Sequence, residues 1–503
     1  MGPPDPPSAP WNELRATLSS LGDAFGNDAA GELEAAGDVR AAEFLRAALR
    51  GDPPGSGAAA AKAAWDRLQT GVGWTTPAWR ECYVLGQLRE AAEAGERADV
   101  AADDANERDD ESETALLRRA MLAVDMAHIM GGPGEIVQRF GAAIEALIAR
   151  RGGKDATSTT TTTTTTTGAA ALIPNALPVR AAVKIDPAHA LERADGITPK
   201  EFKRRFFNAD KPCALGAIGA AWPAIEKWRN LEWFKATHGH RNVPLEIGAY
   251  DDAKRWREET MPLSRFIDEY LLPGLEEERA AAAAGGGGGE EGGGGDEEGG
   301  GAKNVAYLAQ HQLFEQLPSL LRDFDAPDVC GVAGGVQRVN AWIGTAGTVT
   351  PCHFDSYDNL LGQVAGYKFV RLYAESDGAF MYRHAGAWAE NRSWPGAEEE
   401  EEEEGEGENG RKHAAANEDG GGGGGGEDED GAAAMPRGRR NRDAQGNISR
   451  VDVERPDLTK FPLFANATHM DVVIGPGEFI YIPARCWHYV RALTTSVSLN
   501  FLF

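Results

Sequence analysis

The chain has 503 residues, 42% of them hydrophobic, so it can bury a large core and is long enough for more than one domain. Its apolar runs stop well short of the roughly 20 residues of a membrane span, and its start lacks the charged and apolar regions of a signal peptide, so we expect neither a membrane protein nor a secreted one. The formal charge of −27 lies almost entirely in three acidic segments, residues 103–113, 276–298 and 398–430, so the remainder is close to neutral and we expect no direct binding of nucleic acid.

The N-terminal part, residues 10–150, predicts a helical domain. Apolar residues recur three and four positions apart in four segments separated by turns with Gly or Pro, namely residues 41–50, 58–69, 79–94 and 113–130. We expect an all-α bundle or a short array of helix pairs. No catalytic constellation stands out in this part, so scaffolding or partner binding is its expected role.

Low-complexity segments divide the rest of the chain. A threonine run within residues 151–171 predicts a linker, after which a second domain covers residues 172–503. Gly-rich stretches with clustered acids, at about 276–302 and 396–446, predict disordered loops inserted into this domain, because loops tolerate long insertions at little entropic cost. These inserts are either solvated low-complexity loops or surfaces that attract a basic partner.

The second domain changes from a helical period to a strand period. The segments expected to be helical come mostly first, at residues 199–207, 222–227, 231–237, 263–271 and 314–321. The short segments expected to be strands follow, at residues 349–350, 359–364, 368–373, 470–474, 478–482 and 496–501. Many short strands preceded by helices predict a double-stranded β-helix, the jelly-roll or cupin barrel, with a helical apron, and hence an α+β chain.

Three residues of this barrel form a candidate metal site. His353 and Asp355 are two positions apart, so a strand projects both side chains to the same face. His488 follows the strand that ends at residue 482, where a third ligand from a neighbouring strand belongs. Two histidines and one carboxylate are the set that holds ferrous iron for oxygen chemistry. The alternative for His488 is a hydrogen-bonded histidine of the core.

Lys368 suggests an anionic cosubstrate in the same barrel. Strand alternation separates Lys368 from Arg371, so one of the two cations must point inward. A buried ammonium needs a counter-charge, which a dicarboxylate would supply, with hydrogen bonds added by Thr350 and Asn359. The alternative is that the lysine extends to the rim of the barrel.

The cysteines fit a reducing compartment. No Cys-x-x-Cys pair occurs among the five cysteines, at positions 82, 213, 330, 352 and 486, which argues against a disulfide framework and a zinc finger. We interpret Cys352 and Cys486 as small buried thiols beside the metal site. We expect a location in the nucleus or the cytoplasm, and the basic cluster at residues 437–442 makes a nuclear address plausible.

Four motifs occur together in the second domain: His353-Phe-Asp355, Lys368-Phe-Val-Arg-Leu-Tyr373, Gly475-Pro-Gly-Glu-Phe-Ile-Tyr-Ile-Pro483 and Trp487-His-Tyr-Val. This combination resembles the JmjC domain, and most closely its small JmjC-only branch of plant and algal type. The resemblance covers about residues 172–503 apart from the acidic inserts, and a weaker likeness extends into the helical part.

The resemblance implies an oxygenase that depends on Fe(II), 2-oxoglutarate and O2. It assigns the iron to His353, Asp355 and His488. It assigns the distal carboxylate of 2-oxoglutarate to Lys368, assisted by Thr350, Asn359 and Tyr307. Three protein ligands leave room for a chelating 2-oxoglutarate and for dioxygen.

The substrate implied by the resemblance is a basic protein or peptide. Hydroxylation of an arginyl side chain is the favoured reaction, and demethylation of N-methyl-lysine is its alternative. Four residues are candidates for substrate binding: Glu246, which would pair with a cation, and Tyr250, Trp256 and Trp342, which would form aromatic walls. The chain departs from its relatives at its last two residues, Leu502-Phe503, where a tryptophan pair is usual.

Two other classes of function remain open. The chain is either a non-catalytic adaptor that uses its helices and barrel for binding, or a cupin with another activity, such as a metal isomerase or a small-molecule dioxygenase. Intact metal ligands argue against the adaptor, and a cupin of another activity has no need of Lys368.

Overall fold

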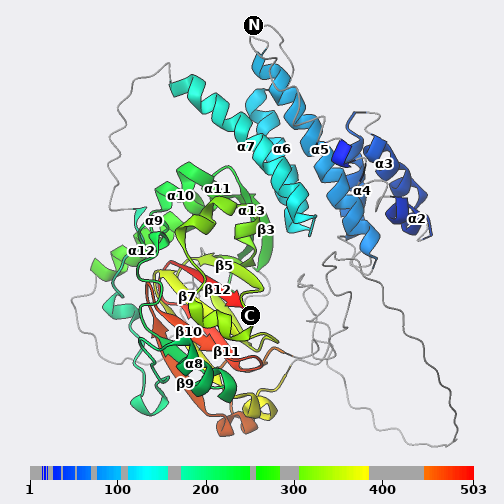
Figure 1. Ribbon diagram of the computed structural model, residues 1–503. Coiled ribbons are helices and arrows are strands. Elements are labelled where there is room, and N and C mark those ends of the chain that lie inside the picture. The colour runs from blue at the N-terminus through cyan, green and yellow to red at the C-terminus, as the bar shows by residue number, and fades with distance from the viewer. Residues whose placement is uncertain are drawn as a thin grey trace, which may run out of the picture.

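A computed structural model of the protein (Figure 1) describes residues 14, 16–18, 20, 27–35, 38–50, 54–68, 76–103, 112–156, 171–249, 256–283, 305–383 and 447–503. Among these residues, no helix is both long and apolar enough to cross a membrane.

The N-terminal part is a bundle of helices, as expected. Its helices are α2 (Asn27–Ala35), α3 (Val39–Arg50), α4 (Ser56–Leu68), α5 (Pro77–Asp103), α6 (Glu113–Ile129) and α7 (Gly134–Ala156). Two apolar clusters hold them together, one among α2 to α5 and one among α5 to α7. We did not predict α2 or α7. The latter buries Val137, Phe140, Ile144 and Leu147 and continues to Ala156, so the first residues of the expected linker are helical.

The C-terminal part is a double-stranded β-helix, also as expected. Its strands are β1 (Cys213–Leu215), β2 (Asn242–Ile247), β3 (Arg257–Pro262), β4 (Ala306–His311), β5 (Arg338–Gly344), β6 (Val349–His353), β7 (Asn359–Ala365), β8 (Lys368–Tyr373), β9 (His469–Ile474), β10 (Phe479–Ile482), β11 (Trp487–Ala492) and β12 (Ser496–Leu502). They form an eight-stranded sheet in the order β1-β10-β7-β12-β5-β4-β2-β3 and a four-stranded sheet in the order β6-β11-β8-β9. The named strand pairs are antiparallel throughout.

Helices cover the larger sheet. They are α8 (Pro199–Arg205), α9 (Pro223–Lys227), α10 (Leu231–His238), α11 (Leu263–Phe266), a π-helical turn (Ile267–Leu271), α12 (Leu272–Ala283) and α13 (Leu313–Gln316). Short 3-10 turns lie at Val179–Ala181, Pro187–His189, Phe207–Ala209, Pro318–Asp323, Asp328–Ala333, Glu375–Phe380 and Pro462–Asn466. Aromatic side chains from the helices, such as Phe202 and Trp222, pack edge-on against Tyr481 and Phe479 of β10. This contact buries the outer face of the sheet and supplies most of the core of the domain.

The first acidic insert begins later than we predicted. Residues 276–283 are the second half of α12, not part of a disordered loop. Glu278 anchors this helix, because its Oε1 accepts from the backbone N of Thr495 at 2.6 Å and from the Oγ1 of Thr495 at 2.7 Å. Leu275 is fully buried below it. Composition alone suggested a loop here, but two contacts to the barrel hold the segment as a helix. The second predicted insert, at about residues 396–446, lies outside the described residues.

We predict that Glu278→Ala destabilises the barrel while Glu277→Ala does not. Removal of the Glu278 carboxylate leaves the amide of Thr495 without its partner, which costs about 1–3 kcal/mol of unfolding free energy. Glu277 lies one position away and is exposed, so it is the matched control. Urea unfolding followed by circular dichroism measures both variants, and equal stability of the two would contradict the role of Glu278.

Candidate metal and cosubstrate site

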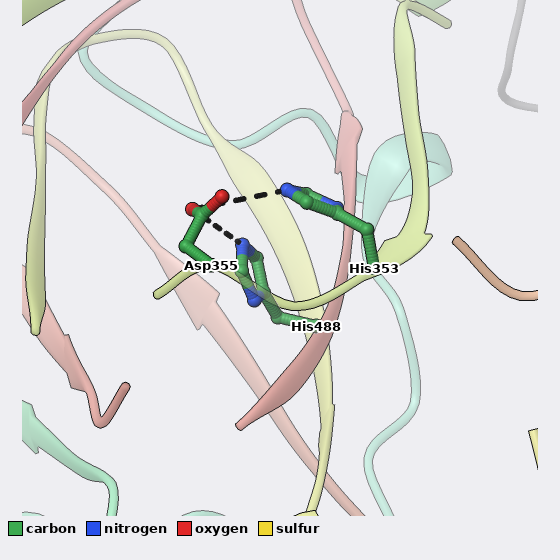
Figure 2. A group of neighbouring side chains, drawn as sticks. All are labelled: His353, Asp355 and His488. Atoms are coloured by element: carbon green, nitrogen blue, oxygen red, sulfur yellow. Dashed lines mark ion pairs between the residues drawn. The ribbon is translucent and has the colours of Figure 1, made fainter. Parts of the chain in front are cut away.

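Adjacent strands bring the three candidate ligands together. β6 ends at His353, β11 starts at Trp487, and His353 and His488 are direct cross-strand partners, with ring centroids 4.2 Å apart. Asp355 follows β6 and turns back over both rings (Figure 2). Its Oδ2 lies 3.9 Å from Nε2 of His353 and 3.8 Å from Nε2 of His488. The three ligand atoms lie within 4.8 Å of one another, close enough to share one ion.

Backbone carbonyls set the tautomer of both histidines. Nδ1 of His353 lies 2.8 Å from the carbonyl of Pro351, and Nδ1 of His488 lies 3.0 Å from the carbonyl of Cys486. A carbonyl only accepts hydrogen bonds, so each Nδ1 donates to it and each Nε2 is left to face Asp355. Burial, and then the neighbouring His353, lower the pKa of His488 to about 4, which keeps this imidazole neutral. Two imidazoles and a carboxylate are a donor set that fits ferrous iron.

The two loops that carry the ligands are joined to each other. The carbonyl of Asp355 accepts from the backbone N of Arg485 at 2.7 Å. The side chain of Asp358 accepts from the hydroxyl of Tyr481 at 2.6 Å and from the backbone N of Ala484 at 3.3 Å. These bonds hold the loop before β11 against the loop after β6, and so fix Asp355 relative to His488.

The neighbouring cysteines are buried, as we interpreted them. Cys352 and Cys486 are both free thiols. Burial raises the pKa of Cys486 to about 12 and also raises the pKa of Cys352. Both therefore stay protonated, and neither belongs to the cluster of candidate ligands.

A cavity of about 450 Å³, counted with its open mouth, contains the three candidate ligands and the expected cosubstrate residues. It is lined by Tyr307, Gln310, Trp342, Thr350, His353, Asp355, Asn359, Leu361, Lys368, Ile482, His488, Val490 and Asn500. Lys368 is 1% exposed, so the alternative position at the rim is wrong. Its Nζ lies 3.2 Å from the hydroxyl of Tyr307, and burial lowers the pKa of the ammonium to about 7.

The polar groups around Lys368 fit a bound carboxylate. Among the described residues, no carboxylate forms an ion pair with Lys368, whose ammonium lies over the rings of Tyr307 and Trp342 at 5.3 and 6.0 Å. Thr350 hydrogen-bonds Tyr307, while burial raises the pKa of this phenol and keeps it neutral. The buried Oδ1 of Asn359 has no hydrogen-bond partner. A buried cation without a counter-ion, beside neutral hydrogen-bonding groups, is a fitting site for an acidic cosubstrate.

The predicted substrate residues are not all in the cavity. Trp342 is in its wall and donates from Nε1 to the Oδ1 of Asn500 at 3.0 Å. Glu246 pairs in register with Tyr307 across β2 and β4, outside the lining residues, and its charge contributes to the raised pKa of this tyrosine. Trp256 is half-buried before β3 and does not line the cavity, and Tyr250 lies outside the described residues.

Sequence reasoning missed several residues of the cavity wall. They are Gln310, Leu361, Ile482, Val490 and Asn500. Alternation from known positions was a signal for two of them, because Val490 follows His488 by two residues and Leu361 follows Asn359 by two. The C-terminal Phe503, where the chain departs from its relatives, stacks on Phe207 instead of lining the cavity.

A double-stranded β-helix with this donor set inside one end is the architecture of a cupin metalloprotein. Residues 199–503 match the model of the family described as "Cupin-like domain", and the chain belongs to that family. It is a JmjC-domain protein, and the JmjC cupin domain places it in the class of 2-oxoglutarate-dependent dioxygenases. This class in general uses Fe(II) and 2-oxoglutarate.

Curated relatives agree with the family. The chain is 30% identical over 339 residues to JmjC domain-containing protein F of Dictyostelium discoideum, covering 60% of this chain and 59% of that protein. It is 27% identical over 515 residues to Lysine-specific demethylase JMJ30 of Arabidopsis thaliana, covering 98% of this chain and 96% of that protein. A more distant human relative, Bifunctional peptidase and (3S)-lysyl hydroxylase JMJD7, is 25% identical over 320 residues, covering 61% of this chain and 81% of that protein.

We predict that a divalent ion stabilises the folded chain through Asp355. An ion that binds only the native state adds about 2.7 kcal/mol at a hundredfold excess over its dissociation constant, so Mn(II) should raise the melting temperature by several degrees. Asp355→Ala removes one of three ligands and should abolish the increase, whereas Asp452→Ala removes an exposed carboxylate and should leave it unchanged. Differential scanning fluorimetry measures the shift; an equal shift in both variants would place the ion elsewhere.

Proposed function

We propose that this chain is a Fe(II)- and 2-oxoglutarate-dependent protein oxygenase that hydroxylates arginyl side chains. One observation carries the proposal: the triad of His353, Asp355 and His488 opens into the same cavity that buries Lys368, for which the described part of the chain supplies no counter-charge. An oxygenase of this class needs both a metal and a fixed cation for its cosubstrate. A metal isomerase has no use for the buried lysine.

The residues of the cavity have separate roles in this proposal. His353, Asp355 and His488 would hold the iron, and Lys368 would pair with the distal carboxylate of 2-oxoglutarate. When bound, iron, 2-oxoglutarate and O2 supply an oxidative decarboxylation that yields succinate and carbon dioxide and hydroxylates the substrate.

The hydrogen bonds of the wall orient the cosubstrate. The hydroxyls of Tyr307 and Thr350, which bond each other, would donate hydrogen bonds to its carboxylate without adding charge. The Oδ1 of Asn359 has no hydrogen-bond partner among the described residues, and the amide of this side chain would donate to the carboxylate from its Nδ2. Leu361, Ile482 and Val490 form an apolar side of the cavity that excludes water from the reacting atoms.

A cationic side chain is the substrate that the residues in and beside the cavity favour. Trp342 in the wall of the cavity offers an aromatic face, and Glu246 places negative charge near its neighbour Tyr307. A guanidinium is planar, so it can stack on an aromatic ring and also pair with a carboxylate. We therefore favour arginine in a basic protein or peptide.

Two alternatives have support of their own. The Arabidopsis relative is named a lysine-specific demethylase and the human relative a lysyl hydroxylase, which favours a lysine substrate of the same chemistry. A non-catalytic adaptor is favoured by the extent of the helical bundle.

The five described free cysteines are buried and unpaired, in keeping with the proposed location in the nucleus or cytoplasm.

We predict that arginine-bearing basic peptides gain one oxygen when incubated with the full chain, Fe(II) and 2-oxoglutarate. Mass spectrometry separates this gain from loss of a methyl group on matched peptides that carry N-methyl-lysine, and a succinate assay follows the cosubstrate. His353→Ala should abolish either product. Methyl loss without oxygen gain on arginine would select the demethylase, and no succinate from any peptide would support the adaptor.

We predict that the affinity for 2-oxoglutarate falls as pH rises above about 7. The free Lys368 has a pKa of about 7, and pairing with a carboxylate raises it, so binding requires the protonated amine. The dissociation constant should be nearly constant well below pH 7 and should approach a tenfold rise per pH unit well above it. Calorimetric titration at several pH values, from roughly 6 to roughly 9, measures this dependence. His488 stays neutral over that range because its pKa is about 4.

Lys368→Met is the control for this pH dependence. The variant keeps an apolar stem of similar length, so it should bind 2-oxoglutarate weakly and with the same constant across the pH range. A wild-type pH profile that persists in Lys368→Met would assign the titration to another group.

A further inference from the structure

Asp125 of the helical bundle is the centre of a buried junction with the barrel. α6 contacts β2, and Figure 1 shows the ends of α6 and α7 beside β3 and α13. Asp125 is 0% exposed. Its Oδ1 accepts from Nε and Nη2 of Arg241, at 3.0 and 2.7 Å, and from Nε2 of Gln316 at 2.7 Å. Its Oδ2 accepts from the backbone N and the Nδ2 of Asn242, at 2.7 and 3.1 Å. One helical carboxylate thus binds two separate segments of the barrel.

The hydrogen bonds of the junction continue into β4, and the donor and the acceptor of each bond are determined. Nε2 of Gln316 donates to Asp125 and to the carbonyl of Asn242, both of which only accept, so the orientation of the amide is determined. Its Oε1 then faces Nε2 of His311 at 2.8 Å, which must carry the proton. Burial lowers the pKa of His311 to about 4, so the ring is neutral. Asp125 therefore sets the tautomer of a histidine in another domain, through one glutamine.

His311 is the last residue of β4, the strand that supplies two residues to the cavity. The pairing of β4 with β5 is irregular between Leu308 and His311. Within this bulge, Gln310 has a left-handed backbone conformation with φ 49°. A residue other than glycine adopts this conformation only where its surroundings impose it. Gln310 and Tyr307 both line the cavity, and the hydroxyl of Tyr307 contacts Lys368. The bonds of His311 hold the end of the strained segment.

The neighbouring strand is held by the same carboxylate. β2 begins at Asn242, which bonds Asp125 through its backbone N and its side chain, and Glu246 of β2 pairs in register with Tyr307. Tyr307 therefore lies on a strand, β4, whose last residue is linked to Asp125 through Gln316, and it pairs with a strand, β2, whose first residue bonds Asp125 directly. A displacement of either strand moves the hydroxyl that contacts Lys368.

We infer that Asp125 is a positioning residue for the cosubstrate cavity, which it controls through Gln316 and His311, so the helical bundle is part of the catalytic unit. The inference rests on the proposed binding of 2-oxoglutarate beside Lys368. It assigns the bundle a role beyond scaffolding or partner binding, because loss of the junction weakens the cosubstrate site without touching any residue that lines it.

Gln316→Met tests the inference, because it removes the bonds to His311 and Asp125 but keeps the volume of the side chain and the Asp125–Arg241 ion pair. Calorimetric titration of 2-oxoglutarate into the full chain loaded with Mn(II) should give a dissociation constant about tenfold higher than that of the wild type (about 1.4 kcal/mol). In turnover with Fe(II), the KM for 2-oxoglutarate should rise in proportion, while kcat at saturation changes less than about twofold. His311→Phe, which keeps a ring against His128, should behave in the same way.

Two variants of the bundle separate positioning from stability. Glu93→Gln removes another carboxylate of the helical domain, whose salt bridge to Arg89 stays within α5, and Leu88→Ala opens the core of the bundle. Both should keep the wild-type dissociation constant within about twofold, even where Leu88→Ala lowers the melting temperature as much as Gln316→Met.

The outcomes distinguish this inference from the proposed function. Unchanged binding by folded Gln316→Met and His311→Phe overturns the inference alone, and so does an equal loss of binding in Leu88→Ala. A wild-type chain that binds no 2-oxoglutarate overturns the inference and the proposed function together.

Discussion

A buried ammonium is the constraint around which this barrel is arranged. Lys368 comes from the middle of the smaller sheet, is 1% exposed and has no carboxylate partner among the described residues. Removing such a charge from water costs several kcal/mol in a protein interior, and here burial lowers its pKa to about 7. The protein therefore holds a group that is stabilised when an acidic ligand enters. The hydroxyl of Tyr307 and the rings around it lessen that cost only in part.

The candidate metal site depends on pairing between strands that are far apart in sequence. His353 and His488 face each other across β6 and β11, and each ring is oriented by the carbonyl two residues before it. The same local pattern thus occurs twice and leaves the Nε2 of both rings directed at Asp355. The loop contacts of Asp355 and Asp358 then complete the geometry from the opposite sheet.

Local patterns predicted what depends on local periodicity. Alternation predicted that either Lys368 or Arg371 points inward, and the structure buries Lys368. The spacing of His353 and Asp355 predicted one shared strand face, but β6 ends at His353 and Asp355 reaches the same site from the loop that follows. β2, β3 and β4 were missed, because Glu246, Glu258 and Gln310 interrupt the apolar pattern and these strands form through pairing with distant neighbours. The junction at Asp125 was missed for the same reason: its partners, Arg241 and Gln316, lie over a hundred residues away in the chain. The periodicity of α6 cannot predict that Asp125 is buried, because the barrel domain, and not the helix itself, covers this carboxylate.

The strand that bears His353 also has a partner on its other side. Ile448 bridges to His353, Ser449 bridges to Arg383, and Asn447 exchanges hydrogen bonds with Phe354. The acidic segment between residues 383 and 447 therefore leaves and re-enters the barrel at two points that are clamped together. Since closing a longer loop between fixed ends adds little free energy, a change in the number of residues between these two points is compatible with an unchanged geometry of the candidate metal site next to them.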